Sequence, residues 1–125
     1  MTTPDLDLSI VIPVYNERNN LVPLEEKLET ELAKLNLSYE IILIDDGSVD
    51  GSHHIIDSLK KSNPRLKLIR FGHNHGQSAA FAAGFKAARG KIFVTLDADM
   101  QNNPADIPLL LEEIKNFDVV CGWRF

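Results

Sequence analysis

The sequence predicts an α/β fold: a Rossmann-like, mostly parallel sheet with helices on both faces. Short apolar segments rich in β-branched residues alternate with segments whose leucines and isoleucines recur every three or four residues. The connections between these segments are short, which is typical of right-handed β-α-β crossovers. With 125 residues, the chain has room for one domain, which we take to span residues 1–125.

Strands and helices are expected in strict alternation. The strands are predicted at residues 8–12, 39–44, 66–71, 92–96 and 118–121. We expect Pro13 to stop the first strand, and we expect the almost wholly apolar second strand to be covered on both faces. The helices are predicted from a leucine stripe over residues 21–35, isoleucines and a leucine over 55–59, small residues over 76–88, and an apolar face that opens at Pro104 or Ala105 and extends to Phe117.

The composition excludes several classes of protein. Lys and Arg number 13 against 18 Asp and Glu, a net charge of −5, which argues against a nucleic-acid-binding domain. Cys121 is the single cysteine, so the chain has neither an internal disulfide nor a zinc site built from cysteines. The sequence shows no signal peptide and no apolar run near the ~18 residues of a membrane span, so we expect a cytoplasmic location.

Common nucleotide-binding and phosphate-accepting motifs are missing from the predicted strand ends. The loop after the first strand reads PVYNE at residues 13–17, where a dinucleotide-binding domain would carry G-x-G-x-x-G. A P-loop motif is missing as well. A flavodoxin-like phospho-acceptor domain would need an acidic pair after the first strand and a lone aspartate after the third, where this chain has Phe71 and Gly72. These three classes are therefore disfavoured.

Acidic residues follow the first, second and fourth predicted strands. In parallel sheets, ligands bind beyond the carboxyl ends of the strands, so these side chains should converge on one edge: Glu17, Asp45, Asp46, Asp97 and Asp99. Neighbouring carboxylates repel one another unless a cation or hydrogen bonds compensate. Oxygen ligands without nearby His or Cys favour hard cations, so we expect Mg²⁺ or Mn²⁺ shared with an anionic ligand.

Two further features lie on the same edge. The segment Asp45-Asp46-Gly47-Ser48 is also typical of a turn, so we expect one aspartate to serve the turn and the other to point into the cleft. The loop at residues 72–76, which carries a pair of histidines, is expected to touch the ligand rather than to hold a metal. The N–H groups that open the next helix are candidates to face a phosphate.

Motifs along most of the chain resemble family 2 glycosyltransferases with the GT-A fold. They are VIPVYNE at residues 11–17, IDDGSVDG at 44–51, DADMQNNP at 97–104 and GWR at 122–124. Gln101, Pro104 and the Gly-x-Arg end make the chain similar to polyprenyl-phosphate sugar transferases, that is, dolichol-phosphate mannose synthase-like and undecaprenyl-phosphate enzymes. The resemblance implies inverting, metal-dependent transfer of a sugar from a UDP- or GDP-sugar to a polyprenyl phosphate lipid.

The resemblance also implies roles for particular residues. The nucleotide-binding set would be Pro13, Tyr15, Glu17, Ile44, Asp46, Asp97 and Ala98. Asp46 would accept a hydrogen bond from the base. The ion, Mg²⁺ or Mn²⁺, would be held by Asp97, Asp99 and Gln101, and would bridge the donor diphosphate. Asp99 and Arg124 would be catalytic, with Arg124 directed towards the acceptor phosphate.

Members of the family continue well past this length, with a second half of the catalytic domain and often membrane helices. We therefore expect the chain to be a truncated, N-terminal nucleotide-sugar-binding part that transfers sugar poorly by itself. The full-length parent is expected at the cytoplasmic face of a membrane. The alternatives are a family 2 enzyme with a saccharide acceptor and a nucleotide-sugar-binding module without turnover. The sugar, the base and the oligomeric state stay open.

Overall fold

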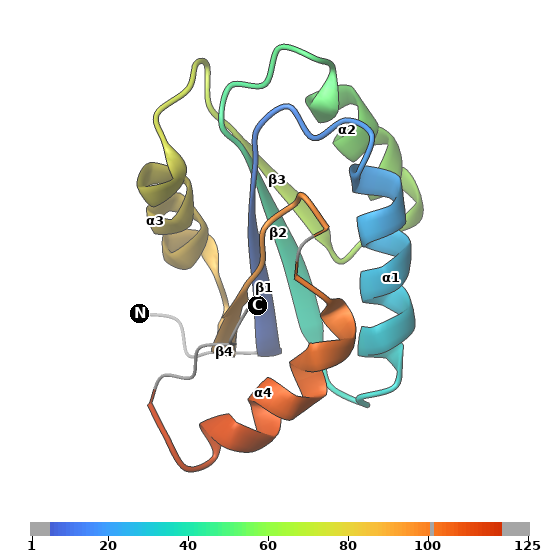
Figure 1. Cartoon of the computed structure of the whole chain (residues 1–125), viewed down its shortest axis with the longest axis vertical. Helices are drawn as coiled ribbons and strands as arrows, with labels where there is room; N and C mark the ends of the chain where they lie inside the picture. Colours follow the sequence, from blue (N-terminus) through green and yellow to red (C-terminus); the bar gives the residue numbers. More distant parts are fainter. Residues whose placement is uncertain (1–5, 101, 119–125) are drawn as a thin grey trace.

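The computed structural model describes residues 6–100 and 102–118, which alternate between strands and helices as the sequence predicts (Figure 1). The strands are β1 (Leu6–Val14), β2 (Tyr39–Asp45), β3 (Leu66–Arg70) and β4 (Gly90–Thr95). The helices are α1 (Leu21–Ala33), α2 (Ser52–Ser62), α3 (Gln77–Ala87) and α4 (Ile107–Ile114), the last preceded by a 3₁₀ turn, η1 (Pro104–Asp106). The strand predicted at residues 118–121 lies, except for Asp118, outside the described residues.

The described part of the sheet is parallel, and its strand order reverses next to β1. Its order is β3-β2-β1-β4, with β1 paired to both β2 and β4 and with β2 paired to β3. The chain therefore builds the sheet in one direction from β1 to β3 and then returns to the other side of β1. Such a reversal opens a crevice at the carboxyl ends of the two strands concerned, here β1 and β4.

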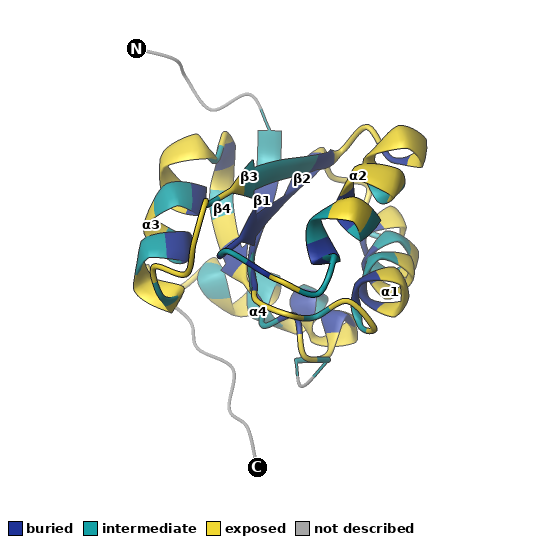
Figure 2. Cartoon of the chain, turned by 90° about the horizontal axis from the view of Figure 1, so that it is seen from above, coloured by how far each residue is buried: buried dark blue, intermediate teal, exposed yellow. Residues whose placement is uncertain are grey.

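Helices cover both faces of the sheet, which confirms the predicted layers. Helix α3 lies on one face, and α1 and α2 lie on the other, as Figure 2 shows from above. On the face of the sheet that α1 covers, the leucines of α1 pack against alternate residues of β1. The α1 residues are Leu21, Leu24, Leu28 and Leu32, and the β1 residues are Leu8, Ile10 and Ile12. The α3 face is a smaller cluster around Val11, Ile44 and Ala80.

Close approach of α3 to the sheet depends on its small residues. A Cβ added at Gly84 would lie 2.4 Å from Val11 Cγ1 and 2.9 Å from Ile44 Cδ1. Those two side chains are fully buried, so neither has room to retreat. The small-residue pattern over residues 76–88 thus marks a helix that packs directly on β1 and β2.

The prediction that Pro13 stops the first strand is wrong: the predicted strand ends at residue 12, and β1 ends two residues later, at Val14. β1 continues through Pro13 and Val14, which pair with Ile44 and Asp45 of β2. The Val11 carbonyl accepts from the Leu96 N–H on the β4 side, so Pro13, two residues on, also turns its nitrogen towards β4. The β1–β4 ladder ends at Val11 and Thr95, so the N–H that proline lacks is not needed there.

The last helix is shorter than predicted. Pro104 opens η1, with the Asn103 side chain accepting from the Ala105 N–H, and α4 ends at Ile114. Phe117, expected on the apolar face, lies beyond the helix and is 59% exposed. None of the helices in the two described segments is both long enough and apolar enough to span a membrane.

A buried carboxylate ties three strands together at the edge of the sheet opposite the crevice. Glu40 is 1% exposed, and it accepts hydrogen bonds from Ser9 Oγ at 2.6 Å, the Arg89 N–H at 2.6 Å and Lys67 Nζ at 2.5 Å. Ser9 Oγ in turn accepts from the Gly90 N–H. Burial raises the pKa of Glu40, but the hydrogen bonds together outweigh it and hold the pKa below its usual value.

We predict that Glu40→Gln lowers the free energy of unfolding by about 2 kcal/mol at neutral pH, because hydrogen bonds to a charged group are lost. The depressed pKa means that Glu40 stabilises the fold above its unfolded-state pKa, near 4.5, and that this contribution disappears as the pH falls through the lower folded-state value. The gap between parent and variant should therefore be constant at neutral pH and close in acid.

Urea denaturation at pH 7 and at acidic pH measures this gap. The matched control is Glu26→Gln on the exposed side of α1, which should change stability by less than about 0.5 kcal/mol. A Glu40→Gln variant as stable as the control at pH 7 would contradict the proposed role of the network.

Candidate functional site

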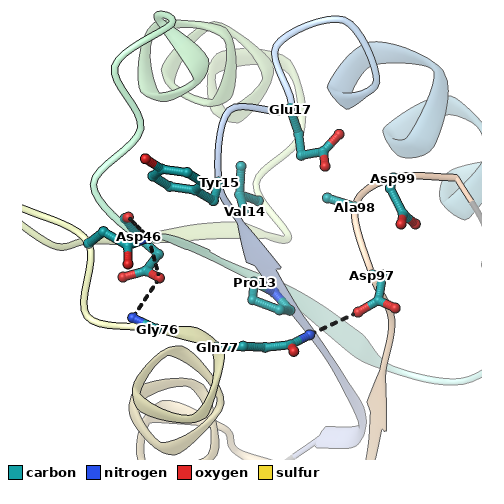
Figure 3. Close-up of a pocket in the computed structure, with 11 residues that line it drawn as sticks. Pro13, Val14, Tyr15, Glu17, Asp46, Gly76, Gln77, Asp97, Ala98 and Asp99 are labelled. Carbon is teal, nitrogen blue, oxygen red and sulfur yellow. Dashed lines mark hydrogen bonds between the residues drawn. The ribbon is translucent and has the colours of Figure 1, made fainter.

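A pocket of about 350 Å³ lies at the carboxyl ends of β1 and β4, where the strand order reverses (Figure 3). Four segments form it: the end of β1 with the loop that follows, Asp46 directly after β2, the stretch after β4, and the start of α3 with the loop before it. The residues that line it are Pro13, Val14, Tyr15, Glu17, Asp46, Asn74, Gly76, Gln77, Asp97, Ala98 and Asp99. The position agrees with the rule for parallel sheets used above.

The structure brings most of the predicted site residues to this pocket. Pro13, Tyr15, Glu17, Asp46, Asp97, Ala98 and Asp99 all line it. Ile44 does not: its side chain is fully buried under α3, because alternate residues of β2 face opposite sides of the sheet. Ile44 is thus not among the residues that line the pocket, and its contact with the nucleotide stays a prediction. Gln101 and Arg124, like Cys121, lie outside the described residues.

The loop after β1 is fastened to the turn after β2. Asn16 has φ of 52°, a left-handed conformation that asparagine tolerates better than most residues. Its N–H donates to Ser48 Oγ at 2.9 Å, and its side-chain Oδ1 accepts from the Val49 N–H at 2.9 Å. The Glu17 N–H donates to Ser52 Oγ, and this hydrogen bond holds the backbone of Glu17 in place. The side chains of Tyr15 and Glu17 thereby reach the pocket from a braced loop.

Asp50 supports the same junction from the other side. Its carboxylate accepts from the Ser52 N–H and hydroxyl and from the Arg18 N–H. Desolvation raises the pKa of Asp50, but the hydrogen bonds from Ser52 and Arg18 lower it by more than that, so the pKa lies below its usual value. The serines and Asp50 of the DGSVDGS segment therefore hold the loop that follows β1.

The two aspartates at the end of β2, Asp45 and Asp46, have different roles, as the sequence predicts. Asp45 is fully buried and its Oδ1 accepts from the Ser48 N–H, which closes the turn. Its Oδ2 lies 3.9 Å from His53 Nδ1, and an ion pair forms there when His53 carries a proton. Asp46 instead lines the pocket. Its carboxylate accepts from the loop at residues 72–76, called here the Asn74 loop.

The opposite side of the pocket carries the acids that follow β4. Figure 3 shows Asp97, Ala98 and Asp99 on one stretch of chain, across the pocket from Asp46. The Asp97 N–H donates to Asn102 Oδ1 at 2.8 Å, and Gln77 Nε2 donates to Asp97 Oδ1 at 3.1 Å. Met100, with φ of 66°, turns the chain just after these acids.

The donor set suits a hard divalent cation. The described residues contain no cluster of three or more His, Cys, Asp or Glu side chains placed to bind a metal. Mg²⁺ and Mn²⁺ do not need one, because such ions commonly take one or two carboxylates and complete their shell with water and substrate phosphates. Asp97 and Asp99, both at the pocket, supply such a pair of carboxylates.

Some lining residues were not among the predicted site residues. Val14 lines the pocket although no role was assigned to it. Asn74 lies in the loop expected to touch the ligand, and Gln77 opens the helix whose N–H groups are candidates to face a phosphate; both line the pocket. The contact of the Gln77 side chain with Asp97 is not predicted from the sequence. His73 and His75 lie with ring centroids 4.1 Å apart and are exposed, and neither lines the pocket.

Comparisons with known proteins agree with this geometry. Residues 9–125 match the sequence model of Glycosyl transferase family 2. The chain is 44% identical over 127 residues to an undecaprenyl-phosphate 4-deoxy-4-formamido-L-arabinose transferase of Aeromonas hydrophila, covering 99% of this chain and 39% of the relative. It is 36% identical over 124 residues to a dodecaprenyl-phosphate galacturonate synthase of Rhizobium johnstonii, covering 95% and 36%. The chain thus spans less than half the length of these relatives.

Solved structures show the same fold at lower identity. A mannosyltransferase from Pyrobaculum calidifontis, PcManGT, in complex with GDP-Man and Mn²⁺, superposes with a TM-score of 0.74 at 21% identity, over 99% of this chain and 38% of that one. S. aureus TarS 1-349 in complex with UDP-GlcNAc gives 0.68 at 21% identity, over 90% and 32%. These neighbours confirm the predicted GT-A fold.

Asn16 provides a direct test of the junction between the two loops. We predict that Asn16→Ala lowers the free energy of unfolding by about 2 kcal/mol, since it loses the bond to Val49 and strains a left-handed residue. Asn16→Gly keeps the left-handed backbone and should lose about 1 kcal/mol less. Urea denaturation of both variants measures the difference, and equal stability of the two would show that the conformation of Asn16 does not matter.

Proposed function

Because the chain belongs to glycosyl transferase family 2, we propose that it is the donor-binding part of an inverting, metal-dependent glycosyltransferase. In this proposal the full-length protein moves a sugar from a UDP- or GDP-sugar to a polyprenyl phosphate. The observation that carries the proposal is the pocket at the β1–β4 crevice, with the carboxylate of Asp46 after β2 and the carboxylates of Asp97 and Asp99 after β4. That division suits a ligand with a nucleoside at one end and a diphosphate at the other.

The nucleoside would occupy the side of the pocket near Tyr15 and Asp46. Tyr15 is 47% exposed at the pocket, so its ring is available to contact a base or ribose. Asp46 already accepts hydrogen bonds on both carboxylate oxygens. A carboxylate oxygen has more than one lone pair, so Asp46 can also accept an N–H from uracil or guanine. Pro13 and Glu17 would complete this side.

The diphosphate would occupy the side near Asp97 and Asp99. An anionic ligand is repelled by these carboxylates unless a cation lies between them. Asp97 and Asp99, with Gln101, would hold Mg²⁺ or Mn²⁺, and Ala98 is small enough to let the ligand approach the backbone. The bound ion would stabilise the negative charge that develops on the leaving diphosphate. This assignment is supported by PcManGT, which has a similar fold and whose structure is in complex with GDP-Man and Mn²⁺.

The acceptor proposal rests on the named relatives, which act with undecaprenyl phosphate and dodecaprenyl phosphate. A phosphate oxygen would attack the anomeric carbon from the face opposite the leaving group. The new carbon–oxygen bond would form as the bond to the diphosphate breaks, which inverts the configuration. The phosphate is already anionic, so this step needs no strong general base. Arg124 would position the phosphate through paired N–H donors.

A polyprenyl acceptor would place the full-length protein at the cytoplasmic face of a membrane. The relatives are more than twice as long as this chain. We propose that the acceptor groove is formed by the part of such a protein that this chain does not span. By itself the chain would then act as a nucleotide-sugar-binding module.

We predict that the purified chain binds GDP or UDP only when Mn²⁺ or Mg²⁺ is present. Asp97→Asn and Asp99→Asn should each weaken this binding by at least about tenfold, because each removes a charge from the cation site. Isothermal titration calorimetry measures it, with Asp57→Asn on the exposed face of α2 as the control. Tight binding without a divalent cation, or binding insensitive to both variants, would contradict the proposed site.

We also predict that the chain alone does not transfer sugar to undecaprenyl phosphate in detergent micelles. A radiolabelled nucleotide sugar and extraction of the lipid product provide the assay, and the A. hydrophila relative is the positive control. Transfer by the 125-residue chain would show that the acceptor site lies within it.

A further inference from the structure

The Asn74 loop, residues 72–76, is held against the turn after β2 by a carboxylate. Asp46 Oδ1 accepts from the His75 N–H at 2.7 Å, and Oδ2 accepts from the Gly76 N–H at 2.9 Å and from Asn74 Nδ2 at 3.1 Å. Asn74 Nδ2 also reaches the Asp46 carbonyl at 3.3 Å. Successive backbone N–H groups directed at one anion form a concave anion-binding arrangement, and its occupant here is the protein's own side chain.

The same loop rests directly on Gly47. A Cβ at Gly47 would lie 2.4 Å from the carbonyl carbon of His73 and 2.5 Å from the nitrogen of Asn74. Both neighbours are backbone atoms, so the loop itself would have to move. This contact is independent of the hydrogen bonds to Asp46, and it fixes the same segment from a second direction.

The position of the loop determines where α3 begins, and so where Gln77 lies. Gly76, with φ of 99°, ends the loop, and Gln77 is the first residue of α3. From there Gln77 Nε2 crosses the pocket to Asp97 Oδ1 at 3.1 Å (Figure 3). A donor of this kind fixes the direction in which a carboxylate presents its other lone pairs. The contacts therefore run without a break from Asp46 through the loop to Asp97.

We infer that the Asn74 loop is a positioning element of the donor site, with Asp46 and Gly47 as its anchors and Gln77 as the residue that orients Asp97. The inference rests on the proposed function and adds to it. Asp46 then serves the proposed cation side of the pocket as well as the proposed nucleoside side. Displacement of the loop weakens the binding of a divalent cation at Asp97, although no loop residue is itself a proposed ligand of the ion.

Gly47→Ala tests this without removing any hydrogen-bonding group. The added methyl collides with the loop and also strains a residue at φ of 76°. Gly51→Ala is the matched control: Gly51 has φ of 89°, so the strain is similar, but a Cβ there meets nothing within 4 Å. The measurements are the affinity for Mn²⁺ alone and the affinity for GDP or UDP with Mn²⁺, both by calorimetry, and folding by circular dichroism.

We expect Gly47→Ala to lower both affinities by about tenfold or more, as loss of a group that supports a metal ligand does, and Gly51→Ala to change them by less than about twofold. Gln77→Ala should lower the affinity for Mn²⁺ while the melting temperature stays near that of the parent. Equal losses in Gly47→Ala and Gly51→Ala, or no loss in Gly47→Ala, would overturn the inference.

Asn74→Ala decides the matter if Gly47→Ala does not fold. It removes the side-chain bonds to Asp46 from an exposed residue and should lower the nucleotide affinity, whereas an unchanged affinity would overturn the inference. A parent chain that binds neither nucleotide with Mn²⁺ contradicts the proposed function, and this inference with it. A parent that binds, together with variants that bind equally well, contradicts this inference alone.

Discussion

The constraint on which the structure depends is the mutual repulsion of carboxylates that parallel strands deliver to one edge of the sheet. Hydrogen bonds stabilise several of these carboxylates in place. Asp45 closes its own turn, Asp46 accepts from the Asn74 loop, and Glu17 accepts from Asn20 Nδ2. Asp97 accepts from Gln77 Nε2. A neutral donor stabilises a carboxylate without cancelling its charge, so a divalent cation would stabilise the pair Asp97 and Asp99 further, on the side of the pocket where we propose that an ion and a diphosphate bind.

This distribution explains why the same motif has both structural and functional residues. In the segment after β2, the serines and Asp50 hold the loop that carries Tyr15. Asp45, at the end of β2, accepts the hydrogen bond that closes the turn. Asp46 faces the pocket, but it also holds the Asn74 loop in place. A substitution in this segment can thus affect ligand binding without touching the ligand. The variants that separate the two effects are those at glycines, where only space and backbone conformation change.

Much of the fold and part of the site could be predicted because they follow from local rules. Strand and helix periodicity located every described element, and the convergence of strand ends brought Tyr15 and Asp97 to one pocket. Individual side-chain contacts between distant residues could not be predicted, because the contact of the Gln77 amide with Asp97 depends on how α3 packs on the sheet. The inward orientation of Ile44 was missed because a motif match does not fix which face of a strand a residue occupies.

A structure determined with Mn²⁺ and GDP or UDP bound tests the central claim most directly, because the anomalous signal of manganese locates the ion independently of any kinetic assay. We expect a manganese peak in contact with the carboxylates of Asp97 and Asp99 and with the diphosphate, and a nucleoside on the Tyr15 side of the pocket. Nucleotide bound in this pocket with manganese elsewhere, or manganese bound with the diphosphate remote from both aspartates, would contradict it.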